Sequence, residues 1–104
     1  MPQHFIFYWG HNTTGTYNFQ WDIIHHDSVV VITASEGRPL ISTAAPQRYV
    51  GAARYTVCNV APHDGGVTFW LDIDWGSPLP TWTTITVFDR NDPMGIDGFH
   101  EPLP

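Results

Sequence analysis

The chain has 104 residues, the length of one ordinary domain, with 14% aromatic and only 13% charged residues. Its net charge is −6, and its four basic residues are all arginines. So few basic residues argue against nucleic acid as a partner and against electrostatic attraction to anionic lipid.

The sequence carries neither a disulfide framework nor a recognisable targeting segment. Cys58 is the single cysteine, so we expect a reducing compartment or release without a signal peptide. The first ten residues lack the basic region and the long apolar core of a signal peptide. No apolar run approaches the roughly 18 residues of a transmembrane helix. The expected location is therefore the cytoplasm or, without a signal peptide, outside the cell.

The first half of the chain predicts several short strands. Residues 4–9 are apolar on both faces and predict a buried strand, which a turn cluster follows at 10–16. Residues 17–24 alternate apolar and polar side chains, which is typical of a half-buried strand. The β-branched run 29–34 predicts a core strand, and residues 40–43 predict a short edge strand.

A hairpin is predicted in the second half. Residues 54–60 form a strand-like run, and Asp64, Gly65 and Gly66 after them favour a tight turn, because glycine adopts positive φ without strain. The next run, 67–75, alternates with a period of two, which places alternate side chains on opposite faces of a strand. One face carries Val67, Phe69, Leu71, Ile73 and Trp75; the other carries Thr68, Trp70, Asp72 and Asp74.

A last strand is predicted from the Thr- and Val-rich run 82–89, and the connector before it contains Gly76, Pro78 and Pro80. No window has a helical period. The sequence therefore predicts an all-β fold, namely a single-domain antiparallel β-sandwich of about six to eight short strands. This domain spans residues 1–104, with an irregular C-terminal segment at 89–104.

Part of this region is similar to two families of lipid-recognising proteins. The stretch DIDWGSPLPTW (72–82) resembles the part of aegerolysins where a strand ends in Asp before Trp-Gly-Ser and a polar connector leads into Thr-Trp. The run VTFWLDIDWGSPLPTWTTITVF (67–88) resembles the part of actinoporins where an aromatic loop lies between two strands. Both families are compact β-sandwiches that recognise membrane lipids. The resemblance therefore implies a β-sandwich fold and lipid recognition. The amphipathic helix with which actinoporins form pores has no counterpart here, so no pore formation is implied.

The aromatic loop supplies the main candidate ligand-binding residues. Trp70 lies on the polar strand face, where it either contacts a ligand or packs against a neighbouring strand. Trp75 and Trp82 flank the Pro-containing loop. They either clamp a sugar ring, a choline-type cation or the bilayer interface, or they cap the core. Leu79 lies at the loop tip, and the pattern offers it no evident partner.

Two acidic groups could supply further chemistry. Asp72 and Asp74 share one strand face about 7 Å apart, which suits acid–base work in a pocket, a hard cation or simply a solvated face. The C-terminal segment offers Asp89, Asn91 and Asp97 as candidate calcium ligands, although its spacing excludes an EF-hand.

The histidines are expected to be surface residues without a metal, and the cysteine is expected to be inert. His25 and His26 would point in opposite directions on a strand, so they are not expected to bind one ion together. Cys58 lies in an apolar strand with no His or Lys next to it, which favours a buried, unreactive thiol.

We therefore expect a non-enzymatic binding module, because no nucleophile–base pair or metal triad can be assembled from neighbouring motifs. The leading expected ligand is a membrane lipid or its headgroup. One alternative is a lectin-like carbohydrate-binding module, with or without calcium. Another is a structural or interaction domain whose strands pair with neighbours, for example in a homo-oligomer.

Overall fold

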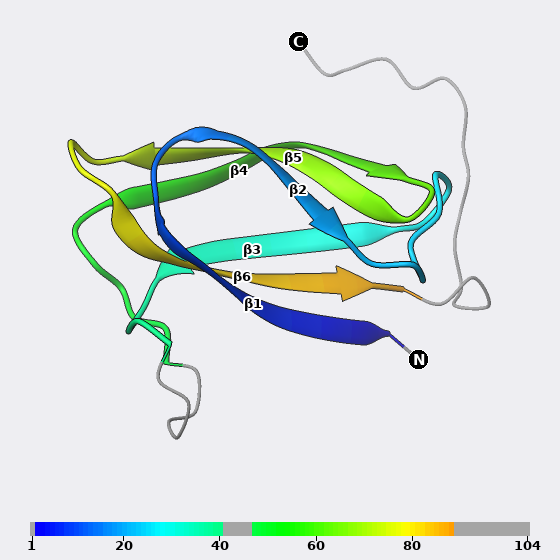
Figure 1. Cartoon of the computed structure of the whole chain (residues 1–104), viewed down its shortest axis with the longest axis horizontal. Helices are drawn as coiled ribbons and strands as arrows, with labels where there is room; N and C mark the ends of the chain where they lie inside the picture. The colour runs from blue at the N-terminus through cyan, green and yellow to red at the C-terminus, as the bar shows by residue number, and fades with distance from the viewer. Residues whose placement is uncertain (1, 41–46, 89–104) are drawn as a thin grey trace, which may run out of the picture.

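Six β-strands make up the regular structure in the computed structural model, which describes residues 2–40 and 47–88 (Figure 1). They are β1 (Gln3–Asn12), β2 (Gly15–Gln20), β3 (Val30–Glu36), β4 (Arg54–His63), β5 (Gly66–Asp74) and β6 (Leu79–Val87). They form two three-stranded antiparallel sheets, ordered β1-β6-β3 and β2-β5-β4. The all-β prediction is confirmed. The described residues contain no helix that is long and apolar enough to cross a membrane.

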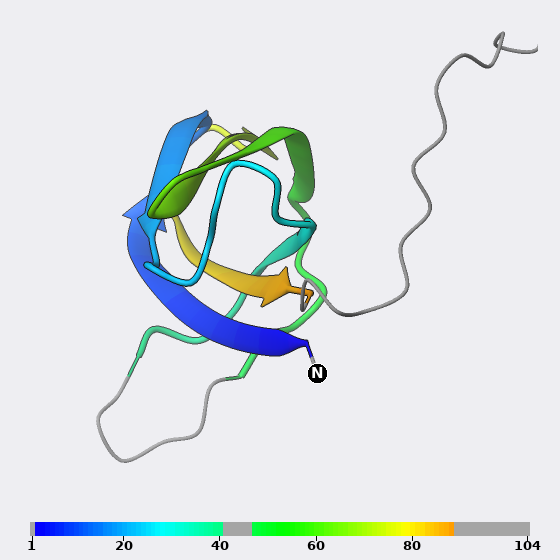
Figure 2. The same ribbon diagram turned by 90° about the vertical axis from the view of Figure 1, so that its right-hand side faces the viewer.

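The hydrophobic core draws side chains from both sheets. Seen end-on, the strands surround this interior (Figure 2). The core members on β2, β3, β5 and β6 are Tyr17, Phe19, Ile32, Val67, Phe69, Leu71, Ile73, Ile85 and Val87. On β5 the four predicted inward residues from Val67 to Ile73 are each at most 4% exposed, as the alternating sequence predicts.

Strand β1 is longer and less buried than its sequence predicts. It pairs only with β6 and therefore lies at a sheet edge, so the prediction of a buried strand is wrong. Phe5 and Ile6 are 40% and 50% exposed. Phe5 still packs edge-on against Phe19 and Trp21, with ring centroids 5.1 and 5.3 Å away. The apolar residues on both faces of β1 thus cover a core on one side and meet solvent on the other.

Strand β3 differs from its prediction in the same way. It lies at the opposite edge of the same sheet, and of its residues only Ile32, which is 8% exposed, is buried. Val31 is 48% exposed, because its side chain lies on the outer face of the sheet. Leu40 is exposed and lies outside any strand, and residues 41–43 of the predicted edge strand lie outside the described residues.

The half-buried strand predicted for residues 17–24 ends at Gln20. The Trp21 amide donates to the Gly65 carbonyl at 2.9 Å, and the Gly65 amide donates to the Ile24 carbonyl at 2.8 Å. These bonds fix a turn that returns Ile24 to the core, where it is fully buried. The loop between β2 and β3 is thereby joined to the turn between β4 and β5.

The predicted β4–β5 hairpin is present, but its glycines have different roles. Only Gly65 has a positive φ, of 93°, so it alone needs the conformational freedom of glycine. Gly66 is the first residue of β5, and a Cβ there would lie 2.5 Å from the Phe19 carbonyl oxygen. The interpretation that Gly66 supplies positive φ is therefore wrong, because close packing against β2 is what requires glycine.

Pro80 also lies inside a strand, contrary to the prediction that the connector holds it. It is the second residue of β6 and pairs with His11, next to an irregularity in β1. The strand start and the irregular partner together tolerate a residue without an N–H donor.

Candidate functional site

The outer face of the β2-β5-β4 sheet carries one large aromatic side chain among polar ones. Trp70, on the central strand, is 42% exposed and pairs with Thr16 of β2 and Cys58 of β4. We call this surface the Trp70 face. It consists of the outward side chains of Thr16, Asn18, Thr56, Cys58, Thr68, Trp70 and Asp72. Of the two interpretations of Trp70, exposure favours ligand contact.

Hydrogen bonds orient the polar groups of this face. The Thr68 hydroxyl donates to Asn18 Oδ1 at 2.9 Å, and His63 Nε2 lies 2.9 Å from the same oxygen. The Thr14 hydroxyl lies 3.1 Å from Asp72 Oδ1, and it also accepts a bond from the Ile73 amide at 2.8 Å. These contacts fix one oxygen of Asp72, whereas its Oδ2 receives no hydrogen bond from the described residues.

Asp72 and Asp74 have different hydrogen-bond partners and do not form a paired acid–base site. Asp74 forms an exposed ion pair with Arg54, at 3.2 Å between Oδ2 and Nη2, whereas Asp72 bonds Thr14. Both carboxyl groups lie on an open strand face, without the shared pocket that acid–base chemistry needs. Asp72 is therefore placed to accept hydrogen bonds from a ligand, and Asp74 is already engaged.

A polar hollow of about 350 Å³ adjoins the Trp70 face. Thr14, Thr16 and Asn18 line it, together with residues of the β1–β2 turn and with Trp9 and Tyr17. The Tyr17 hydroxyl donates to the Thr13 carbonyl at 2.7 Å, and burial raises the pKa of this phenol. Trp70, Asp72 and this hollow thus form one continuous surface of aromatic, hydroxyl, amide and carboxylate groups.

Trp75 does not continue the inward alternation of β5. The strand ends at Asp74, and the Trp75 amide donates to the Ile73 carbonyl at 2.8 Å, which turns the chain outward. The Trp75 side chain is 49% exposed, in a loop whose Gly76, Ser77 and Pro78 are also exposed. The expectation that Trp75 faces the core is wrong, and its ring is open to a ligand.

Trp82 has the opposite environment. It is only 2% exposed, although it lies on the outer face of the β1-β6-β3 sheet. Its indole nitrogen donates to the Arg38 carbonyl at 2.7 Å, and its ring packs on Tyr8 with centroids 4.9 Å apart. The structure thus supports packing for Trp82, and its ring offers no free face to a ligand.

Leu79 does not project from the loop tip. It is half-buried as the first residue of β6 and packs against the core. Of the predicted loop residues Trp75, Leu79 and Trp82, only Trp75 is accessible.

No group of three or more His, Cys, Asp or Glu side chains in residues 2–40 and 47–88 could hold a metal ion. The predicted calcium ligands Asp89, Asn91 and Asp97 lie outside the described residues. Cys58 is partly exposed, so the expectation of a buried thiol is wrong. Its strand is an edge strand, which leaves the thiol beside Trp70 incompletely covered.

His25 and His26 converge, contrary to the expectation that they diverge, because they lie in a loop and not on a strand. Their Nδ1 atoms lie 3.9 and 3.1 Å from Asp64 Oδ1. The hydrogen bonds from the ring and the amide of His26 lower the pKa of Asp64. Sequence reasoning missed this contact, since it depends on the β2–β3 loop lying against the β4–β5 turn.

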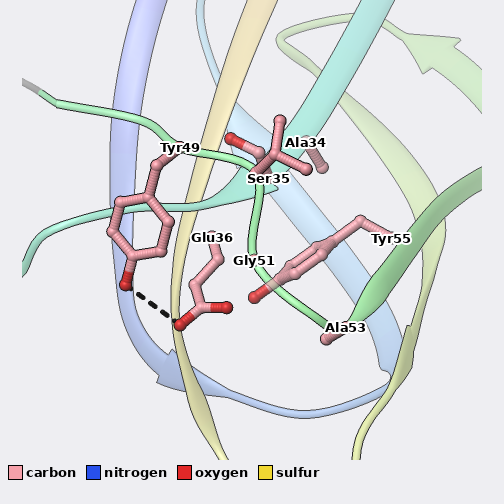
Figure 3. A pocket seen from close by; sticks show the side chains of 8 residues that line it. Ala34, Ser35, Glu36, Tyr49, Gly51, Ala53 and Tyr55 are labelled. Carbon is pink, nitrogen blue, oxygen red and sulfur yellow. Dashed lines mark hydrogen bonds between the residues drawn. The ribbon is translucent and has the colours of Figure 1, made fainter.

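A second, smaller cavity lies between the end of β3 and the start of β4 (Figure 3). Its volume is about 170 Å³. Its lining residues are Ala34, Ser35, Glu36, Tyr49, Val50, Gly51, Ala53 and Tyr55. No motif marks these residues in the sequence, because they come from two separate segments, 34–36 and 49–55, that meet only in the fold.

The chain was compared with protein-family models, curated proteins and solved structures, and none of them matches it.

Proposed function

We propose that this protein is a non-enzymatic binding module, built as a single antiparallel β-sandwich, and that it binds carbohydrate on the Trp70 face. The observation that carries the proposal is the exposed ring of Trp70 at the centre of a sheet face whose other side chains are small or polar. An exposed large aromatic side chain in such a setting is characteristic of binding surfaces.

Sugars combine apolar ring faces with hydroxyl groups, and the Trp70 face offers partners for both. The indole ring can stack against the C–H face of a sugar ring. Asp72 Oδ2 can accept a hydroxyl hydrogen bond, and Thr16 and Asn18 lie directly across the strand pairs from Trp70 and Thr68. The adjoining hollow of about 350 Å³ is large enough for a sugar ring.

Membrane lipid is the second candidate ligand, and the exposure of Trp75 favours it. A half-exposed tryptophan in a loop stiffened by Pro78 suits the interfacial region of a bilayer. The resemblance of residues 67–88 to aegerolysins and actinoporins points in the same direction. The burial of Trp82 and Leu79 weakens this candidate, because the loop then offers one aromatic anchor instead of three apolar contacts.

Two matched variants distinguish the ligands. Wild type, Trp70→Ala and Trp75→Ala are applied to a glycan array and sedimented with phosphatidylcholine–sphingomyelin vesicles. We expect glycan signals that Trp70→Ala abolishes and Trp75→Ala leaves intact. Vesicle binding that is lost only in Trp75→Ala would instead assign the protein to lipid. If no glycan is bound, or if Trp70→Ala binds glycans like the wild type, the carbohydrate proposal is overturned.

The low number of basic residues predicts how the affinity depends on salt. Whichever ligand binds, the affinity should change little between 50 and 300 mM salt, since screening acts mainly on charge–charge attraction. Binding that collapses over about this range would point to a cationic ligand attracted by the net charge of −6, and away from both candidates.

A further inference from the structure

The cavity beside Glu36 holds a carboxylate without a cationic partner. The Tyr49 hydroxyl donates to Glu36 Oε2 at 3.0 Å, which is the one hydrogen bond to this side chain among the described residues. Glu36 Oε1 lies against Gly51, where even a Cβ would overlap it. The carboxylate is thus held in place, and it carries a negative charge into a partly enclosed space.

The arginines nearest to this cavity in the sequence are engaged elsewhere. Arg48 donates to the hydroxyls of Ser35 and Thr84, at 2.6 and 2.5 Å. Arg38 donates to Gln47, and Arg54 pairs with Asp74. No Arg or His nitrogen in residues 2–40 and 47–88 pairs with Glu36. The unmatched charge of Glu36 therefore selects a positively charged ligand.

The other groups around Glu36 specify the kind of cation. Figure 3 shows the carboxylate between the phenol oxygens of Tyr49 and Tyr55. The Tyr55 oxygen lies 3.5 Å from the Thr81 hydroxyl, and burial raises the pKa of Tyr55, so this phenol is neutral at pH 7. Two phenol oxygens therefore lie beside the charge. They suit a cation that donates hydrogen bonds better than a quaternary ammonium, which has no N–H to donate.

Most of the remaining lining is apolar and small. Ala34 and Ala53 have no hydrogen-bonding side chains, Val50 is exposed, and the Ser35 hydroxyl already accepts a hydrogen bond from Arg48. A volume of about 170 Å³ equals that of five or six water molecules at about 30 Å³ each, so it admits a short alkyl chain but not a drug-sized ligand. Lysine has this combination of an apolar stem and a terminal ammonium group.

We propose that this cavity binds a primary alkylammonium group, as carried by the side chain of lysine in a peptide or by a free alkylamine. The chain has no lysine of its own, so a second copy of the described sequence cannot supply this side chain. The net charge of −6 favours the approach of such a cation. This site shares no residue with the Trp70 face, and it does not depend on the carbohydrate proposal.

An NMR titration of the ¹⁵N-labelled protein at pH 7 tests the site, with n-butylammonium chloride as the probe. We expect amide shifts at Glu36, Gly51 and Ala53. Neither n-butanol, which lacks the charge, nor tetramethylammonium, which lacks N–H donors, should shift these amides. Equal shifts with either compound would overturn the proposal, as would no shifts with n-butylammonium. A lysine-containing tetrapeptide and its lysine-acetylated form then separate the sources: tighter binding of the lysine peptide indicates a protein partner, and weaker binding a free amine.

Matched variants locate the binding. Glu36→Gln keeps the shape and an acceptor for Tyr49 and should raise the Kd at least about tenfold, because hydrogen bonds to charged groups are the strong ones. Asp74→Asn removes one exposed charge elsewhere and should change the Kd less than about twofold. Ala53→Leu fills the cavity without changing its charge and should abolish binding. Undiminished binding by either cavity variant overturns the proposal, and Ala53→Leu decides it if Glu36→Gln fails to fold.

Discussion

The two sheets present a matched pair of tryptophans with opposite environments. Trp70 lies on the outer face of β5, and Trp82 lies on the outer face of β6, and each strand is the central strand of its sheet. Trp70 is 42% exposed, whereas Trp82 is 2% exposed. Strand position and side-chain direction are therefore equivalent for the two residues, and something outside the strands decides their exposure.

The part of the chain outside the strands that covers Trp82 is one segment, which acts together with the Tyr8 ring of β1. Residues 37–38 and 47–48, which we call the cover segment, contact the Trp82 end of the β1-β6-β3 sheet. The Arg38 carbonyl accepts the indole hydrogen bond, and Gly37 bridges to Arg48 in a short antiparallel contact. Arg48 is anchored to the sheet through Ser35, Thr33 and Thr84, and burial lowers its pKa without removing its charge at neutral pH. Over Trp70, the described residues place no such segment.

Replacing the two tryptophans should give the largest difference in the free energy of unfolding. Trp82→Ala should lower the free energy of unfolding by about 3–5 kcal/mol, because it empties a covered site. Trp70→Ala should change it by only about 0.5 kcal/mol or less, as for other exposed surface positions. Urea unfolding followed by circular dichroism measures both. Equal losses in the two variants would show that the cover segment does not bury Trp82 in solution.

Substitution of Gly37, where the cover segment contacts Trp82, should have the next largest effect on stability. A Cβ on Gly37 would overlap the Trp82 ring and lie 2.5 Å from the Gln47 carbonyl oxygen. Gly37→Ala should therefore destabilise the fold by about 1–3 kcal/mol through overpacking. Gly76→Ala is the matched control, since a Cβ there meets nothing within 4 Å. Thermal unfolding compares the two, and a Gly37→Ala protein as stable as the control would mean that the packing at Trp82 is loose.

Removing Arg48, which anchors the cover segment to the sheet, should have the third largest effect on stability. Arg48→Met keeps an apolar stem but removes the donors to Ser35 and Thr84, and should cost about 1–2 kcal/mol. Arg54→Met breaks only an exposed ion pair with Asp74, and should cost less than about 1 kcal/mol. The fluorescence of Trp82 should shift to longer wavelength in Arg48→Met alone. An unchanged spectrum with unchanged stability would mean that contacts other than those of Arg48 hold the cover segment over Trp82.

The predictions that succeeded from the sequence are those that depend on neighbouring residues. The alternation from Val67 to Ile73 placed four side chains in the core, and Asp64-Gly65 marked the hairpin. Both signals depend only on local backbone geometry. The same alternation placed Trp70 on the outer, polar face, where it is 42% exposed, but it left open whether this ring packs against a neighbouring strand.

Features that depend on distant residues were left open or predicted wrongly. The burial of Trp82 depends on Arg38, which is 44 residues away in the chain. The exposure of Ile6 and Val31 depends on β1 and β3 lying at sheet edges, and periodicity does not reveal strand order. Trp75 shows a third cause: the strand ended one residue before it, and the alternation no longer applied. Nor does the sequence reveal the cavity at Glu36, whose lining comes from segments that meet only in the fold.

The smallest expected effect concerns a contact that, unlike the cover segment, is made by exposed groups. Asp64 in the β4–β5 turn accepts hydrogen bonds from the ring and the amide of His26 in the β2–β3 loop. These bonds lower the folded-state pKa of Asp64 below its ordinary value of 3.8. A lowered carboxyl pKa contributes stability above the unfolded pKa, and that contribution is lost as the pH falls below 3.8 through the folded pKa.

Asp64→Asn should therefore melt slightly below the wild type at pH 7, and the difference should disappear as the pH falls below 3.8. Melting temperatures of both proteins across this range test the prediction. In a His26→Ala background the difference at pH 7 should shrink without vanishing, because the amide of residue 26 still donates to Asp64. A difference that persists below the folded pKa would mean that Asp64 stabilises the turn through its shape and not through its charge. The join between the two loops would then depend on the shape of the Asp64 side chain and on the Trp21 and Gly65 backbone bonds, and not on an ionised carboxylate.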